Sequence, residues 1–173
     1  YLVGRIEGKN LLFRDRTDSY MLHGYDDEMN QLFEKKVELK NRRARILDVI
    51  PGQNDFTVVY RYFKKGRIEV FAQRISPEGD TLASQMISQF NPRVNNFMEV
   101  HRSQDRSKLM IVDTDLGKRI FVTVFDLDNF TVLWDRSFTP PDFSFERDFL
   151  DAEIDNQGNG YLILEKDNRK SKR

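Results

Sequence analysis

The sequence has no cysteine and only two histidines, His23 and His101, among its 173 residues. The absence of cysteine excludes disulfides, thiolate catalysis and cysteine-ligated zinc. Because the two histidines are far apart in the chain, we expect neither a histidine metal site nor a catalytic triad. We therefore expect no resident metal, no cofactor and no enzymatic activity.

Neither sign of charge is in excess, because 28 lysines and arginines balance 28 aspartates and glutamates. Nucleic-acid binding usually requires a strong basic field, which a zero net charge does not supply. Basic residues interleaved with aromatic ones could still hold a single strand. The balance of charge instead favours basic residues that lie on solvated loops beside carboxylates, so no nucleic-acid partner is expected. The basic clusters are 35–36, 40–45, 64–67 and 169–173.

Long apolar runs are also missing, and stretches such as Leu109–Val112 are far too short to cross a bilayer as a helix. No transmembrane segment is therefore expected. The chain begins at Tyr1 without a methionine or a leader, which is typical of a processed chain or of a part of a longer one. Its 14 phenylalanines and 6 tyrosines nevertheless indicate a folded core.

Short β-type runs recur along the chain at intervals of about 45 to 53 residues. Each run follows a polar turn rich in residues that tolerate a left-handed backbone or hydrogen-bond their own chain. The runs are Asn10–Phe13, Asp55–Val59, Lys108–Val112 and Gly160–Leu164. A repeat of this length indicates one supersecondary unit used several times.

The second and third repeats share a hairpin in their later half. Lys65–Ile68 and Gly117–Ile120 each lead into an alternating strand, and a further turn and strand follow. Four antiparallel strands in about 50 residues are typical of a β-propeller blade. The sequence therefore predicts an all-β fold of β-propeller repeats with four-stranded antiparallel blades, three complete and one truncated.

The expected blades form a single propeller segment covering residues 1–40, 41–90, 91–140 and, in part, 141–173. Their innermost strands are expected near 2–3, 46–50, 97–100 and 152–154. The fourth unit stops after its second strand near Glu165. The basic tail 168–173 falls where the hairpin to a third strand would begin.

One segment also fits a helix. Met29, Leu32, Phe33 and Val37 lie at helical spacing, so an amphipathic helix over residues 28–44 is an alternative. A strand with Phe33 and Val37 on one face keeps the repeat in register, and we favour the strand.

The fourth unit, Asp151–Leu164, resembles the WD-repeat-like β-propellers of bacterial secreted and envelope proteins. A Trp-Asp pair occurs only once, at Trp134–Asp135, so the resemblance is to the general repeat. It implies a scaffold that binds partners, placed in the periplasm or outside the cell. It carries no catalytic residue to this chain.

Several polar residues are candidates for a site. Asp155–Asn159 places carboxylate, amide and glycine together as a calcium loop does, but position twelve of the loop is Lys166 instead of glutamate, which favours a turn. The carboxylates of 113–115 and 126–129 are likewise expected in turns. We expect each histidine to be solvated or to have its hydrogen bonds satisfied in the core. Two places are open to Phe143, Tyr60 and Tyr62: the core, or the surface as exposed aromatics that bind a partner.

An end blade leaves an unpaired strand edge. In the truncated fourth unit this edge is formed by Tyr161, Leu162, Ile163 and Leu164, and it is the predicted contact site. Strand addition from a protein partner or from a second copy of the chain would cover it. The predicted function is a non-enzymatic propeller scaffold for protein–protein interaction. The alternative is a carbohydrate- or other ligand-binding propeller, with hydrolysis as a variant, that uses its central funnel.

Overall fold

The structure is a computed structural model, and it describes residues 1–16, 19–91, 98–115, 119–144 and 148–166. Within these residues every regular element is a β-strand. The helical alternative at 28–44 is not realised, because β4 (Gln31–Val37) runs through this segment as a strand. The basic tail 168–173 lies outside the described residues.

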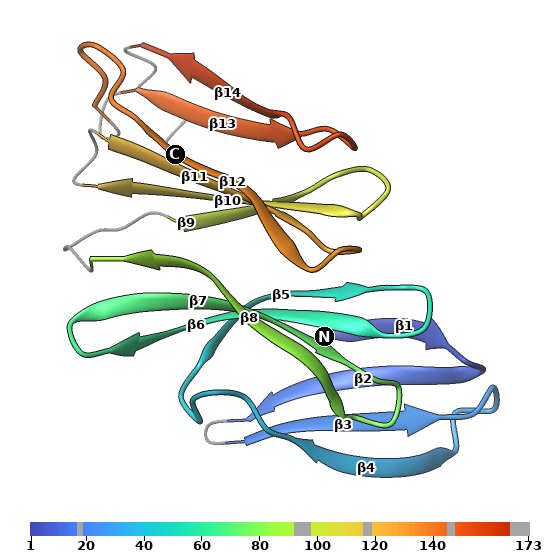
Figure 1. Cartoon of the computed structure of the whole chain (residues 1–173). Coiled ribbons are helices and arrows are strands. Elements are labelled where there is room, and N and C mark those ends of the chain that lie inside the picture. The colour runs from blue at the N-terminus through green and yellow to red at the C-terminus, as the bar shows by residue number, and fades with distance from the viewer. Residues whose placement is uncertain (17–18, 92–97, 116–118, 145–147, 167–173) are drawn as a thin grey trace. The chain divides into compact units, whose positions relative to one another are not determined.

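The fourteen strands form four antiparallel sheets in which consecutive strands are neighbours (Figure 1). The first two sheets comprise β1 (Leu2–Ile6), β2 (Lys9–Arg16), β3 (Ser19–Tyr25) and β4, and then β5 (Arg45–Pro51), β6 (Phe56–Lys64), β7 (Arg67–Ile75) and β8 (Thr81–Phe90). The third sheet comprises β9 (Met98–Arg102), β10 (Lys108–Asp115), β11 (Arg119–Asp126) and β12 (Thr131–Phe138), and the fourth β13 (Phe149–Ile154) and β14 (Gly160–Glu165). The predicted fold is therefore confirmed: an all-β chain of three complete four-stranded blades and a truncated fourth.

The chain divides into two compact units, residues 1–90 and 91–173, and each is described by itself. In unit 1 (1–90), inward-facing residues of the first two sheets share one core, with Phe13 and Tyr20 of the first sheet and Phe56 and Tyr60 of the second. In unit 2 (91–173), Met110 and Val124 of the third sheet pack with residues of β13. Each sheet thus buries a face against its neighbour within the unit, as blades do.

Chain direction alternates from strand to strand, so the connections of each unit lie at two opposite ends. In unit 1 the β1–β2, β3–β4, β5–β6 and β7–β8 turns share one end, and the β4–β5 connection and the β6–β7 turn share the other (Figure 1). An ion pair of 2.8 Å between Lys9, which starts β2, and Glu78 of the β7–β8 turn confirms the first grouping.

The polar turns use a recurring five-residue arrangement. In the β3–β4 turn, Asp26 accepts hydrogen bonds from the backbone amides of Glu28 and Asn30. In the β13–β14 turn, Asp155 accepts the same pair from Gln157 and Asn159. The predicted inter-strand turn at Asp155–Asn159 is confirmed, because its aspartate bonds its own chain.

Candidate functional site: the open edge of the truncated sheet

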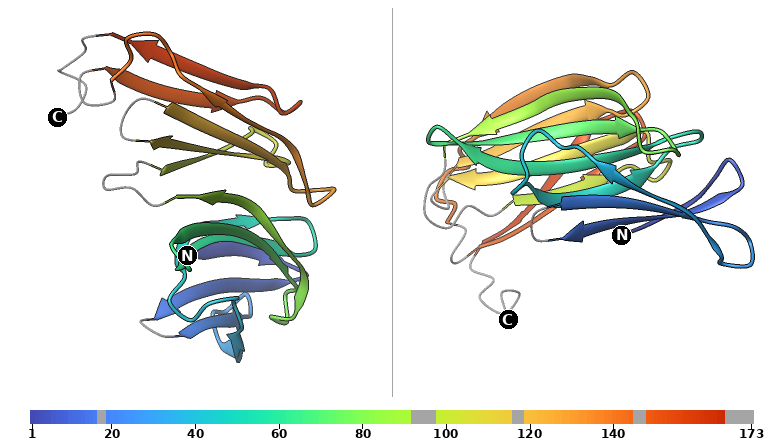
Figure 2. Two further views of the ribbon diagram at one scale, coloured as in Figure 1. Left: turned by 60° about the vertical axis from the view of Figure 1, so that its left-hand side comes forward. Right: turned by 90° about the horizontal axis from the view of Figure 1, so that it is seen from below.

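The predicted contact strand, β14, pairs with β13 on one side only (Figures 1 and 2). No other strand of the described residues hydrogen-bonds to its second edge. Tyr161 is 54% exposed and Ile163 52%, and Leu164 is also exposed, while Leu162 is partly buried against the core of unit 2. The structure thus brings the four predicted residues together on one strand with an open edge and apolar side chains on both faces.

The equivalent strand of the preceding sheet is β10, which has the same place in the repeat and the same apolar character. It lies between β9 and β11. Its residues Leu109, Met110, Ile111 and Val112 are fully buried or nearly so. β14 therefore has the composition of an internal strand but the surroundings of an edge strand.

The outer strands of the complete sheets differ from β14. β4, β8 and β12 each meet their neighbour through at least one β-bulge or irregularity, and β4 and β12 also carry charged side chains. Bulges and charges protect natural edges from pairing with another chain. β14 pairs with β13 in unbroken register, and its only charged residue is Glu165 at its end. Its edge therefore lacks the protection that the other outer strands have.

A surface groove of about 300 Å³ opens beside the start of β14. Its lining combines an apolar surface with one cation. The lining residues are Trp134, Arg136 and Phe138 of β12 together with Asn159 and Gly160. The groove thus lies between β12 and the turn that leads into β14.

Trp134 is held in place by the turn that precedes β14. Its Nε1 donates a hydrogen bond of 2.9 Å to the backbone carbonyl of Gly158. A Cβ on Gly160 would lie 3.1 Å from Cη2 of Trp134 and 2.9 Å from Sδ of Met110, so glycine permits this close approach. The groove is therefore rigidly attached to the open edge.

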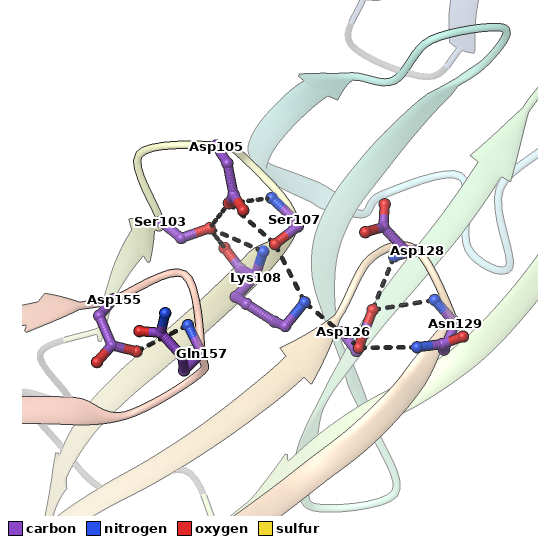
Figure 3. A network of polar contacts seen from close by, with 9 residues as sticks. All are labelled: Ser103, Asp105, Ser107, Lys108, Asp126, Asp128, Asn129, Asp155 and Gln157. Atoms are coloured by element: carbon purple, nitrogen blue, oxygen red, sulfur yellow. Dashed lines mark hydrogen bonds and ion pairs between the residues drawn. The ribbon is translucent and has the colours of Figure 1, made fainter.

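The turns at this end of unit 2 form a polar network (Figure 3). The backbone amide of Asp105 donates to Oδ1 of Asn156 at 3.2 Å, which joins the β9–β10 turn to the β13–β14 turn. Nζ of Lys108 lies 3.4 Å from Oδ2 of Asp126. Ser103 donates to Asp105 at 2.7 Å.

The carboxylates of this network are occupied by their own turns. The side-chain hydrogen bond from Asn159 holds the pKa of Asp155 below its ordinary value. Burial raises the pKa of Asp126, but hydrogen bonds from Asn129 outweigh burial and leave that pKa lowered. Among the described residues, no three histidine, aspartate or glutamate side chains are grouped to hold a metal ion. The carboxylates here stabilise turns.

Two expectations from the sequence need correction, and one open alternative is decided. Asp113 and Thr114 lie in β10 and not in a turn, because they continue the ladder opposite Phe121 and Ile120. Of the two places open to Phe143, Tyr60 and Tyr62, the structure shows the core, because all three are buried. His23 is buried, but neither ring nitrogen has a hydrogen-bond partner; Oε2 of Glu34 lies 3.7 Å from Nδ1.

His101 has a polar partner in its own strand. Its Nε2 lies 3.2 Å from Oε2 of Glu99 in the same strand, and it is partly buried. The groove at Trp134 escaped the sequence analysis. The single Trp-Asp pair drew attention to Trp134. Its position against Gly160 could not be predicted, because it depends on a register shift where β12 pairs with β11.

No protein-family model matches the sequence, and no curated protein matches it. Several solved structures are similar in fold. TolB from Acinetobacter baumannii is 17% identical over 91% of this chain, with a TM-score of 0.42, and the Nup133 β-propeller domain from Vanderwaltozyma polyspora is 12% identical over 95%, with 0.41. Prolyl oligopeptidase B from Galerina marginata is 9% identical over 94%, also with 0.41. This chain spans 40%, 52% and 24% of those three chains.

No helix among the described residues is long and apolar enough to span a membrane.

Proposed function

We propose that this chain is a non-enzymatic propeller scaffold that binds another polypeptide by strand addition along β14. As the resemblance of its repeats implies, the scaffold belongs to a bacterial envelope or secreted protein. One observation carries the proposal: β14 has the composition of the buried strand β10, yet its second edge is open and unprotected.

The backbone of β14 supports this mode of binding. The amide of Asp155 donates to the carbonyl of Asn159 at 3.1 Å, so these two residues form a hydrogen-bonded pair at the start of the ladder. Hydrogen-bonded pairs alternate along an antiparallel ladder. The amides of Leu162 and Leu164 therefore point away from β13, toward the open edge. An incoming strand finds donors there without displacing a bond to β13.

The groove beside β14 indicates the chemistry of the incoming segment. Trp134 and Phe138 offer apolar surface, and Arg136 offers a fork of donors that suits a carboxylate. The occupant is therefore an extended segment of another chain with alternating apolar residues and an acidic residue that reaches Arg136. A scaffold role also agrees with the carboxylates of unit 2, which are engaged in their own turns.

The first test is the absolute mass of the chain by light scattering on a sizing column at several concentrations. If a second copy supplies the strand, the mass corresponds to a dimer that dissociates on dilution. The variant Ile163→Lys places a charge on the edge and yields a monomer. Leu82→Lys is the matched control, because Leu82 is 56% exposed on β8, an edge that already has bulges, and its mass stays that of the wild type.

The second test detects strand addition when the chain is a monomer. The probe is a fluorescent peptide of Arg119–Asp126, the third strand of the preceding sheet, measured by anisotropy. The wild type and Leu82→Lys bind it, while Ile163→Lys and Leu164→Pro, which removes an outward amide, lose at least about tenfold in affinity. A monomer that does not bind the peptide, or variants that all behave alike, would refute the proposal.

A further inference from the structure

The two ends of unit 1 carry opposite charge. The turns 7–8, 26–30, 52–55 and 76–80 lie at one end and contain seven carboxylates and no lysine or arginine. We call these turns the acidic end. The β4–β5 connection and the β6–β7 turn lie at the other end, which we call the basic end, defined by residues 38–44 and 64–67 (Figure 1). The basic end has six basic side chains and one carboxylate, Glu38.

Strand residues neutralise much of the acidic end. Four of its carboxylates form ion pairs with cations that project from the strands. The pairs are Asp27 with Arg5 at 2.9 Å, Glu78 with Lys9 at 2.8 Å, Asp80 with Lys35 at 2.6 Å and Asp55 with Arg74 at 3.5 Å. The acidic end therefore has less free charge than its composition indicates.

The basic end is not neutralised in this way. Its one carboxylate, Glu38, pairs with Lys36 of β4 at 2.7 Å. Within the described ranges, no carboxylate forms an ion pair with any of the six cations of this end, Lys40, Arg42, Arg43, Lys64, Lys65 and Arg67. The cations of this end are therefore available to an external anion.

The β4–β5 connection lies against β6, the strand that leads into the β6–β7 turn. The backbone amide of Lys40 donates to the hydroxyl of Tyr60 at 3.3 Å, which places the connection over the inner face of β6. Side chains two residues apart share a strand face, so Lys64 continues the face of Tyr60 toward the tip of the hairpin. The connection itself lines a concavity of about 560 Å³ with Leu39, Lys40, Asn41, Arg42 and Arg43.

Two like charges also face each other across neighbouring strands at this end. Lys64 lies directly opposite Arg67. Like charges in this position destabilise a sheet. Beside them, Phe63 projects from the opposite face of β6 and is 62% exposed. A hairpin tip with an exposed aromatic side chain and flanking cations suits contact with both headgroups and acyl chains.

We propose that the basic end of unit 1 binds the surface of an anionic lipid membrane, with the cations on the phosphates and Phe63 at the acyl boundary. The distribution of charge favours a flat charged surface as the partner. The protein has no net charge, but its two ends differ in sign, so an anionic surface would attract the basic end and orient the protein. A single-stranded nucleic acid would require several stacking aromatics, and Phe63 is the one large aromatic exposed on the described part of these two connections and their flanking strands. This proposal is independent of strand addition at β14.

The test is co-sedimentation of the full chain with vesicles of phosphatidylcholine alone and with about 30% phosphatidylglycerol added, which gives the vesicles a negative surface potential. We expect binding only to the anionic vesicles, and loss of binding when salt is raised from about 0.1 M to about 0.5 M. Replacing Arg42, Arg43, Lys64 and Lys65 by alanine should lower the partition coefficient at least about a hundredfold. Phe63→Ala should lower it by about tenfold while the salt dependence remains.

The matched control removes the same charge from elsewhere in unit 1. Arg5, Lys9, Lys35 and Arg74 are replaced by alanine, so the net charge equals that of the test variant, and we expect vesicle binding to be retained. An equal loss in both quadruple variants would overturn the proposal, since net charge alone would then explain it. Equal binding to both vesicle types would also overturn it. Tighter binding to an oligonucleotide than to anionic vesicles would assign the basic end to nucleic acid instead.

Discussion

Strands β10 and β14 have the same place in the repeat, but their side chains have different surroundings. Ile111 of β10 is 1% exposed, and the corresponding Ile163 of β14 is 52% exposed. The pairing differs as well, since β11 covers the second edge of β10 and no described strand covers that of β14. Composition alone therefore does not determine burial. It indicates which strands are suited to pair on both edges. β14 has such a composition, but one of its edges is open.

The largest expected effect contrasts these two isoleucines. Ile111→Lys buries an unpaired charge and should destabilise the fold by more than about 4 kcal/mol, or prevent folding. Ile163→Lys should change the free energy of unfolding by less than about 0.5 kcal/mol, because the side chain is half exposed. Urea unfolding followed by circular dichroism measures both values. Equal destabilisation would mean that β14 is covered in the isolated chain.

A second change acts where the truncated sheet meets the complete one. In Gly160→Ala the new Cβ would meet Sδ of Met110 at 2.9 Å and Cη2 of Trp134 at 3.1 Å. The overpacking should cost about 1–3 kcal/mol. Ile163→Ala, on the same strand but exposed, is the control and should have a smaller effect. Unfolding in urea that leaves both variants as stable as the wild type would contradict this packing.

A third change removes one hydrogen bond beside the groove. Trp134→Phe keeps an aromatic ring but loses the 2.9 Å bond from Nε1 to the carbonyl of Gly158. We expect a loss of about 1 kcal/mol in stability. Amide hydrogen exchange should show faster exchange in the β13–β14 turn and an unchanged rate in β2. Equal acceleration in both places would mean that the effect is not local.

The smallest effect concerns pH. Because the hydrogen bond from Asn159 lowers the pKa of Asp155 in the folded state, the carboxylate contributes stability above its unfolded pKa of about 3.9. That contribution is lost as pH falls through the lower folded value. Asp155→Asn should therefore be less stable than the wild type at pH 7, and the gap should close below about pH 3. Urea titrations at each pH measure the gap, and a difference between Asp155→Asn and the wild type that stays constant down to about pH 2 would contradict this prediction.

Much of the fold could be predicted because turn chemistry and strand alternation are local signals. Lys65–Gly66 and Asp155–Asn159 mark turns in the sequence, and the structure places turns there. The strand at 31–37 was harder, since helical spacing coincided with alternation, and pairing with β3 decided it. Such pairing is a long-range interaction that a sequence window does not contain.

The open edge at β14 was also predictable, because it follows from counting strands in the repeat. The groove at Trp134 and the two charged ends of unit 1 were not. Both depend on strand direction and register, which bring together residues as distant as Lys40 and Tyr60. The balance of charge in the sequence predicted that nearby carboxylates accompany the cations, but the carboxylates of the unit 1 turns lie mostly at the opposite end.

The bulges of the outer strands limit how many strand edges can pair with another chain. Because β4, β8 and β12 are irregular where they meet their neighbours, these sheets do not readily extend sideways. Among the described strands at the outer margin of a sheet, β14 alone keeps a regular ladder to its very edge. If a guest strand binds there as proposed, the outer strands of each chain offer one such position, and we expect a stoichiometry of one guest strand to one chain.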